Sequence, residues 1–68
     1  MRLGEILRSR RMKAGLSERA MALAIGRTGV FVRSYESGKA ALTVEELEQV
    51  AHVLRSTLGA LIEEYESV

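Results

Sequence analysis

The 68-residue sequence contains no cysteine and only one histidine, His52. Without cysteine, no disulfide and no thiolate-bound metal can brace the fold, and a single histidine does not supply the ligands of a structural zinc ion. The sequence also lacks an apolar run long enough to cross a membrane and lacks a signal-peptide pattern. We therefore expect a cytoplasmic protein with no cofactor, no metal, no membrane contact and no small-molecule ligand.

The net charge of +1 conceals an uneven distribution of charged residues. Residues 1–39 hold nine basic and three acidic side chains, a formal charge of +6, whereas residues 40–68 hold one basic and six acidic side chains, a formal charge of −5. A basic half of this kind favours a polyanionic partner such as nucleic acid. Charge alone fits a solvated surface equally well, so the placement of motifs has to decide.

Residues 17–26 predict a short helix with clear ends. Ser17 is suited to cap it, because a serine hydroxyl can accept a hydrogen bond from an N–H group of the first turn. Met21, Ala24 and Ile25 then recur at helical spacing. Gly26 follows at the point where helices commonly end in a left-handed conformation, which glycine adopts without steric cost.

A second short helix is expected over about 29–37. Thr28 can cap it, Val32 and Tyr35 form its inner face, and Gly38 ends it. Two helices joined by a short glycine-containing turn make a helix-turn-helix, here over about 17–38. The same pattern fits an αα-hairpin in a small bundle that binds no nucleic acid, so both interpretations stay open on this segment alone.

Short motifs spaced along residues 3–62 carry a family resemblance that covers the chain without a gap. They are Leu3-Gly4-Glu5, Gly15-Leu16-Ser17, Met21-Ala22, Ile25-Gly26, Val32, Tyr35-Glu36, Gly38-Lys39, Leu47, Val50-Ala51 and Leu54. In their joint spacing the chain resembles the lambda-repressor-like family, also called the Cro or Xre family. The resemblance implies one all-α domain over residues 1–68, a compact five-helix fold that binds operator DNA as a homodimer.

The resemblance makes the helix over about 29–37 the recognition helix, which lies in the major groove. The residues expected to face the bases are Thr28, Gly29, Val30, Arg33 and Ser34. Arg33 is the strongest candidate because a guanidinium commonly donates to O6 and N7 of guanine. Val30 can meet a thymine methyl group.

Four further positions are expected beside DNA phosphates, namely Ser17, Glu18, Arg27 and Lys39. Arg27 replaces the small apolar residue usual in the turn of this family. Glu18 replaces a glutamine, and its carboxylate would repel a phosphate. Because a carboxylate suits the positive end of a helix dipole, stabilising the helix is the other role open to Glu18.

The first helix, expected over about 2–14, has an apolar stripe that passes through Arg10 and Arg11. A guanidinium on a buried face needs a carboxylate partner, because an unpaired buried charge is very costly. Family members often pair an arginine at the position of Arg11 with a glutamate at the position of Glu36. We therefore expect a structural salt bridge between Arg11 and Glu36.

The C-terminal helices are expected over about 43–66, with Thr43 and Glu46 forming a capping box. The apolar face of the first of them is expected to bury Val44, Leu47, Val50, Ala51 and Leu54. Arg55 stands where the family usually has glycine, so the turn there is expected to be strained or differently shaped. The apolar face of the last helix is expected to cap the core and to form the homodimer contact through Leu58, Leu61, Ile62 and Tyr65.

Two functions remain after these observations. The leading one is a sequence-specific DNA-binding transcriptional regulator, a repressor that binds a palindromic operator as a homodimer. The alternative is a helix-turn-helix-fold module for protein interaction, such as an antitoxin or anti-repressor partner, with weak DNA affinity. Phe31 belongs to this choice, because it either packs inward, which we favour, or contacts another protein. An enzyme is not expected, since the sequence shows no nucleophile–base pair and no cluster of metal ligands.

Overall fold

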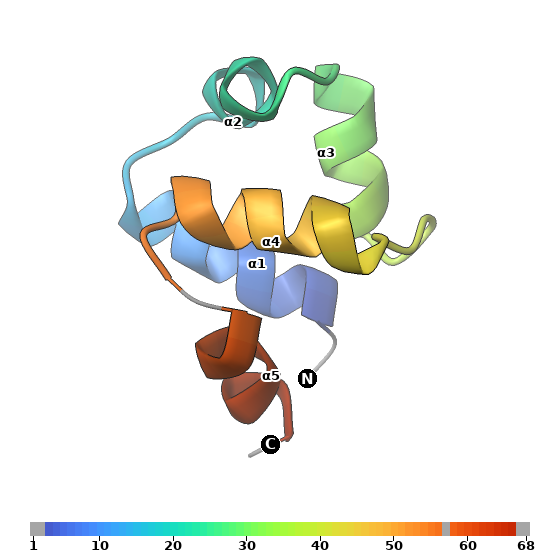
Figure 1. Cartoon of the computed structure of the whole chain (residues 1–68). Coiled ribbons are helices and arrows are strands. Elements are labelled where there is room, and N and C mark those ends of the chain that lie inside the picture. Colours follow the sequence, from blue (N-terminus) through green and yellow to red (C-terminus); the bar gives the residue numbers. More distant parts are fainter. Residues whose placement is uncertain (1–2, 57, 67–68) are drawn as a thin grey trace.

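The computed structural model describes residues 3–56 and 58–66, which form five helices and no strand. The helices are α1 (Leu3–Lys13), α2 (Glu18–Ile25), α3 (Gly29–Glu36), α4 (Val44–Val53) and α5 (Leu58–Glu66). The predicted five-helix, all-α fold is confirmed, with helix ends that differ from the expected ones by one residue at most. In Figure 1, α4 lies in front of α1, α2 and α3 lie above this pair, and α5 lies below it.

Four of the helices end in the same hydrogen-bonded turn, a Schellman motif. In each, the residue in the left-handed conformation donates its N–H three residues back, and the next residue donates five back, as in the bonds from Gly15 to Met12 and from Leu16 to Arg11. The left-handed residues are Gly15, Gly26, Gly38 and Arg55, with φ of 75°, 68°, 81° and 55°. The strain expected at Arg55 is therefore present, because it is the one residue of the four with a Cβ.

Replacing Arg55 by glycine is expected to stabilise the domain by about 0.5–1 kcal/mol. A left-handed conformation costs an L-residue roughly 1–2 kcal/mol, and part of the relief is offset by the larger entropy that glycine loses on folding. The urea midpoint should rise with an unchanged slope. Arg55→Ala is the matched control, because it removes the guanidinium but keeps the Cβ, and it should give no gain. A lower midpoint for Arg55→Gly than for Arg55→Ala would refute this account of the turn.

The core is formed by one apolar face from every helix, with α3 packed on α1 and α2, α4 on α2, and α5 on α1 and α4. Its fully buried side chains are Ile6, Leu7, Met21, Val32, Val50 and Leu61. Two expectations about apolar positions need correction. Ala24, which recurs with Met21 and Ile25 at helical spacing, is exposed, and its neighbour Ala22 is buried instead. Val44 is 64% exposed rather than buried, because a helical side chain tilts toward the N-terminus and at the first residue of α4 points past the helix end.

Gly4 marks the closest approach between α1 and α3. A Cβ added at Gly4 would meet the carbonyl oxygen of Tyr35 and would lie 2.5 Å from that of Glu36. Both atoms belong to the backbone of α3, so they cannot rotate aside. The absence of a side chain at Gly4 therefore lets α1 lie directly against the C-terminal turn of α3 and fixes the position of that helix.

Candidate nucleic-acid interface

The helix α3 is held so that one face is buried and the opposite face is offered to solvent. Thr28 caps it, its hydroxyl accepting a hydrogen bond from the N–H of Phe31 at 3.2 Å. Val32 and Tyr35 are buried on the inner face. On the outer face Val30 is 72% exposed and Arg33 is exposed, while Gly29 and Ser34 are partly exposed.

A buried ion pair fixes the C-terminal end of α3 to α1. Nε of Arg11 donates to Oε2 of Glu36 at 2.8 Å, and Nη2 donates to Oε1 at 3.2 Å. Nη1 of Arg11 donates to the carbonyl oxygen of Leu16 at 2.7 Å. Both side chains are more than nine-tenths buried. The hydrogen bond that Arg11 donates to Glu36 is the main cause that raises the pKa of Arg11 above its usual value, so the guanidinium stays charged.

This pair is the structural salt bridge that the sequence predicts, and it joins three parts of the chain. Arg11 lies on α1, Glu36 ends α3, and Leu16 belongs to the connection that leads into α2. A bidentate arginine–carboxylate pair fixes orientation as well as distance. The pair therefore fixes the orientation of α3 relative to α1 and the start of α2. Neither side chain is exposed for a ligand.

Arg33 on α3, expected beside the bases, and Glu18 on α2, expected beside a phosphate, contact each other. Nη2 of Arg33 donates to Oε1 of Glu18 at 3.2 Å. The side chain of Arg33 is 74% exposed and that of Glu18 is 34% exposed. This pair was not predicted from the sequence, because the two residues lie fifteen positions apart and only the turn between α2 and α3 brings them together.

Arg27 lies in the turn between α2 and α3 and makes two contacts with the rest of the domain. Its Nη2 is 3.0 Å from Oε2 of Glu46 on α4, and its guanidinium lies 4.8 Å from the centre of the Phe31 ring. A cation over an aromatic face at this distance is attracted by the ring. The side chain of Arg27 remains 47% exposed, so these contacts orient it while leaving surface for a phosphate.

Phe31 packs inward rather than standing free. It is half-buried against the core, and its ring meets that of Tyr35 edge-on, with 5.6 Å between centres and 70° between planes. Edge-to-face contacts of this kind are favourable beyond the apolar area that they bury. Packing against Tyr35 therefore fixes the Phe31 ring, which in turn contacts the Arg27 guanidinium.

Glu46 has two roles, of which the sequence predicts only the first. It completes the capping box with Thr43, whose N–H donates to Oε1 of Glu46 at 2.8 Å, while the N–H of Glu46 donates to the Thr43 hydroxyl at 3.1 Å. The bond from the Thr43 backbone is the main cause that lowers the pKa of Glu46. Glu46 is thereby kept ionised for its second role, the ion pair with Arg27.

The remaining predicted phosphate contacts lie at the two ends of the helix-turn-helix. Ser17 caps α2, its hydroxyl accepting the N–H of Ala20 at 3.0 Å. Lys39 follows α3, is exposed, and donates its backbone N–H to the carbonyl oxygen of Ser34 at 2.9 Å. A backbone position fixed in this way holds the start of a flexible lysine side chain beside the end of α3.

The expected dimer contact on α5 is described in part. Leu61 has no exposed surface and packs in the core of its own chain, whereas Ile62 is 41% exposed. The side chains of Leu58 and Tyr65 lie outside the described residues. Of the four residues expected at the dimer contact, Ile62 is thus the one that the structure describes as exposed.

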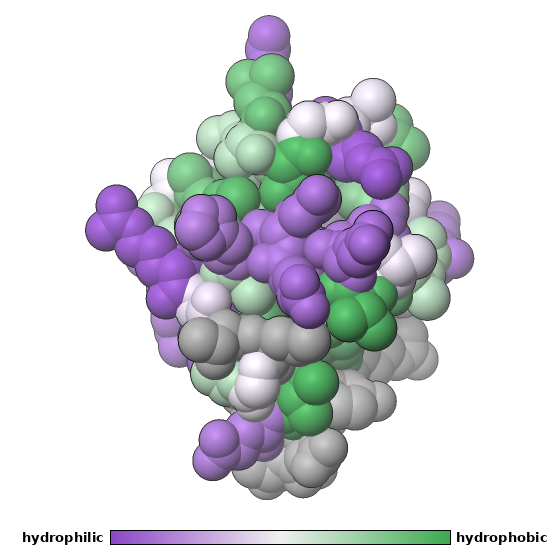
Figure 2. Space-filling model, in the orientation of Figure 1, coloured by the Kyte–Doolittle hydropathy of each residue, from purple (hydrophilic) through white to green (hydrophobic). Residues whose placement is uncertain are grey.

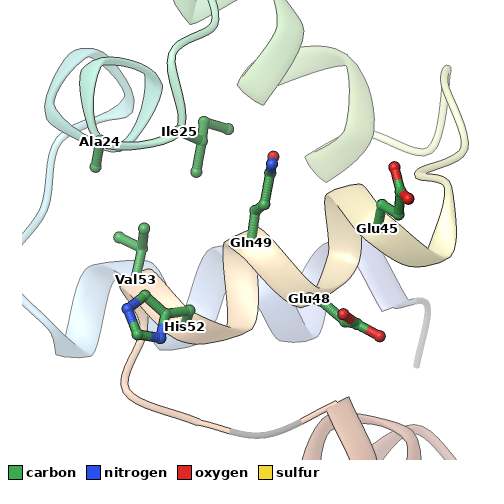
Figure 3. Close-up of a pocket in the computed structure, with 7 residues that line it drawn as sticks. All are labelled: Ala24, Ile25, Glu45, Glu48, Gln49, His52 and Val53. Atoms are coloured by element: carbon green, nitrogen blue, oxygen red, sulfur yellow. The ribbon is translucent and has the colours of Figure 1, made fainter.

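A shallow groove between α2 and α4 forms a second surface feature (Figure 3). Its lining consists of Ala24, Ile25, Glu45, Glu48, Gln49, His52 and Val53. Figure 2 shows the hydrophilic side chains of this face gathered over α4. The two glutamates would repel a phosphate backbone, so this groove lies outside the candidate interface. Within the described part of the chain no cluster of His, Cys, Asp or Glu could hold a metal ion, and no helix is long and apolar enough to cross a membrane.

Comparison with known proteins places the chain in a family. The model of the helix-turn-helix domain family matches residues 2–64, so the chain belongs to that family, in agreement with the lambda-repressor-like resemblance. The solved structure of the clp gene regulator ClgR from Corynebacterium glutamicum superimposes with a TM-score of 0.90 at 28% identity, covering 96% of this chain and 69% of that one.

A second relative is an enzyme. The chain is 36% identical over 58 residues to (S)-2-hydroxypropylphosphonic acid epoxidase from Streptomyces wedmorensis, which covers 84% of this chain but 29% of the epoxidase. A structure of this epoxidase superimposes with a TM-score of 0.80 at 35% identity, covering 87% of this chain and 31% of that one. The chain thus spans less than a third of the enzyme that it matches.

This relative corrects the expectation that the chain is not an enzyme. That expectation rested on the lack of catalytic groups in the sequence. The match contradicts it, because a domain similar to this one forms part of an epoxidase chain. Catalytic groups can lie in segments beyond such a domain, so their absence from 68 residues carries no conclusion about enzymatic activity.

Proposed function

We propose that this chain binds double-stranded DNA as the DNA-reading module of a transcriptional regulator. The observation that carries the proposal is the geometry of α3, which the buried Arg11–Glu36 pair fixes in place while Val30 and Arg33 stand exposed on its outer face. Membership in the helix-turn-helix family and the similarity to the regulator ClgR support it. The formal charge of +6 on residues 1–39 supplies the attraction to phosphates.

Within this proposal α3 enters the major groove and the residues around it divide into two sets. Arg33 and Val30 read base edges, and Thr28, Gly29 and Ser34 bring the start and the middle of α3 close to the bases. Ser17, Arg27 and Lys39 lie beside phosphates. The proposal keeps the residues expected from the sequence except Glu18, to which we assign a different role because it pairs with Arg33.

The finer proposal is a repressor that binds a palindromic operator as a homodimer. A two-fold dimer presents two recognition helices to half-sites about one helical turn apart. Ile62 on α5 offers apolar surface for the contact between copies. Sedimentation with and without operator duplex tests this part, and a single copy on each duplex would contradict it.

Replacing Arg33 by alanine is expected to weaken binding to an operator duplex by roughly 1–3 kcal/mol and to relax discrimination at one base pair. Lys39→Ala is the contrasting variant, because loss of a phosphate contact weakens binding to all sequences alike and reduces the salt dependence. Binding of both variants is measured by fluorescence anisotropy on the operator duplex and on single-base variants of it. An equal loss on every duplex for Arg33→Ala would make Arg33 a phosphate contact instead.

The alternative function, a protein-interaction module, has one observation in its favour. Val30 on α3 and Leu23 on α2 are 72% and 73% exposed, and exposed apolar side chains can serve a protein partner. The salt dependence of binding distinguishes the two functions. A protein contact through Val30 and Leu23 would persist at high salt, whereas binding to DNA phosphates would not.

A further inference from the structure

The ion pair between Glu18 and Arg33 places a negative charge inside the surface that would face DNA. It joins the first residue of α2 to the outer face of α3 at 3.2 Å. Glu18 also lines a small hollow together with Arg8, Arg33, Glu36 and Ser37. Since the Glu36 carboxylate is paired with Arg11, the Glu18 carboxylate has two basic side chains, Arg8 and Arg33, around the same hollow. Most of the Arg33 side chain is exposed, so the pair leaves room for a further contact.

A guanidinium has five N–H donors, and the contact with Glu18 uses Nη2. Nη2 carries a second hydrogen, which forms a fork either end-on with Nη1 or side-on with Nε, and either fork can donate to O6 and N7 of guanine. The Glu18 contact and a guanine contact are therefore compatible on one arginine. A phosphate contact is different, because it would bring a second anion close to the carboxylate.

We propose that Glu18 is a positioning residue that determines specificity, holding Arg33 toward base edges and opposing its use as a general phosphate contact. This inference rests on the DNA-binding function proposed above and assigns a role within it. Affinity for random DNA comes almost entirely from phosphate contacts, whereas an operator adds base contacts. A carboxylate that repels phosphates but leaves the base contacts unchanged weakens binding to random DNA more than binding to the operator. It therefore raises the ratio of operator affinity to random-DNA affinity.

A purely structural role for Glu18 leads to a different expectation. At the first turn of α2 a carboxylate stabilises the helix through the dipole, and its loss would lower the thermal midpoint slightly. Stability alone changes neither the slope of binding against salt nor the ratio of operator to random affinity. Those two quantities therefore separate the roles.

The experiment compares Glu18→Gln with Glu48→Gln, which removes the same charge from an exposed position on α4 outside the candidate interface. The probes are a random-sequence duplex and the duplex most enriched from a random pool by the unaltered protein. For Glu18→Gln we expect roughly three- to tenfold tighter binding to random duplex and a salt slope steeper by about 0.9, one additional phosphate. Binding to the enriched duplex should change less than about twofold, because the guanine contact remains.

Two controls assign the effect to Arg33. Glu48→Gln should change random binding by less than about twofold, because its charge lies away from the phosphates and is screened. When Arg33 is already replaced by alanine, adding Glu18→Gln should likewise change the affinity for random duplex by less than about twofold. If Glu18→Gln and Glu48→Gln change the affinity for random duplex and its salt slope equally, each as a single substitution, the inference is wrong while the proposed DNA binding stands. If the unaltered protein binds no duplex even at low salt, the proposed function fails and the inference falls with it.

Discussion

Replacing Glu36 by glutamine should destabilise the domain by about 3–5 kcal/mol, the usual effect of leaving one member of a buried ion pair without its partner. The Arg11 guanidinium would remain buried against an uncharged amide that supplies one acceptor oxygen in place of the two used at 2.8 and 3.2 Å. A domain of this size has roughly 3–10 kcal/mol of total stability. The variant is therefore expected to lose roughly a third or more of the stability of the domain.

The measurement is urea unfolding followed by the helical circular dichroism signal. Glu48→Gln is the matched control, since it makes the same chemical change on an exposed side chain and should stay within about 0.5 kcal/mol of the unaltered protein. The double variant Arg11→Met, Glu36→Leu should recover much of the loss, because apolar residues of similar volume often replace a buried pair without cost. A loss below about 1 kcal/mol for Glu36→Gln would show that the pair does not hold α3.

The second large effect is expected for Gly4→Ala, at about 2–3 kcal/mol of lost stability. The added Cβ has to displace the backbone of α3 at Tyr35 and Glu36, and forcing extra atoms into a packed site typically costs 1–3 kcal/mol. Because Glu36 also carries the buried ion pair, the displacement would disturb the Arg11 contact as well.

Gly59→Ala provides the control for this prediction. Gly59 lies in α5, and a Cβ there meets nothing within 4 Å. The higher helix propensity of alanine should therefore stabilise the domain by roughly 0.5–1 kcal/mol. Opposite signs for the two glycine variants in one urea series support the close approach of α1 and α3, and equal small effects would contradict it.

Features that depend on neighbours in the sequence were predictable here. The caps at Ser17, Thr28 and Thr43 each use a hydroxyl and an N–H three residues away, and a preference of this kind acts over one helical turn. The strained turn at Arg55 was expected from the family resemblance, because the family usually has glycine at that position, and Arg55 does adopt the left-handed conformation that Gly15, Gly26 and Gly38 adopt at other helix ends.

The Arg11–Glu36 pair spans 25 positions and was expected only because the family often carries an arginine and a glutamate there. The ion pairs of Arg33 with Glu18 and of Arg27 with Glu46 had no such guide. Each joins exposed or half-exposed side chains from different parts of the chain. Such pairs contribute little to stability, and no pattern of buried residues in the sequence predicts them. Their effect is on the charge of the candidate interface, where Glu18 stands beside the residue expected to read bases.

The central claim is that α3 and the surface around it bind DNA, and a titration of the protein against random-sequence duplex at two salt concentrations tests it most directly. The account predicts binding at low salt that weakens with a slope of about −2 to −4 in log affinity against log salt, for two to four phosphates contacted. Selection from the random pool should then enrich a two-fold-symmetric site with half-sites about one helical turn apart. Absence of binding at low salt, or binding that salt leaves unchanged, would contradict it.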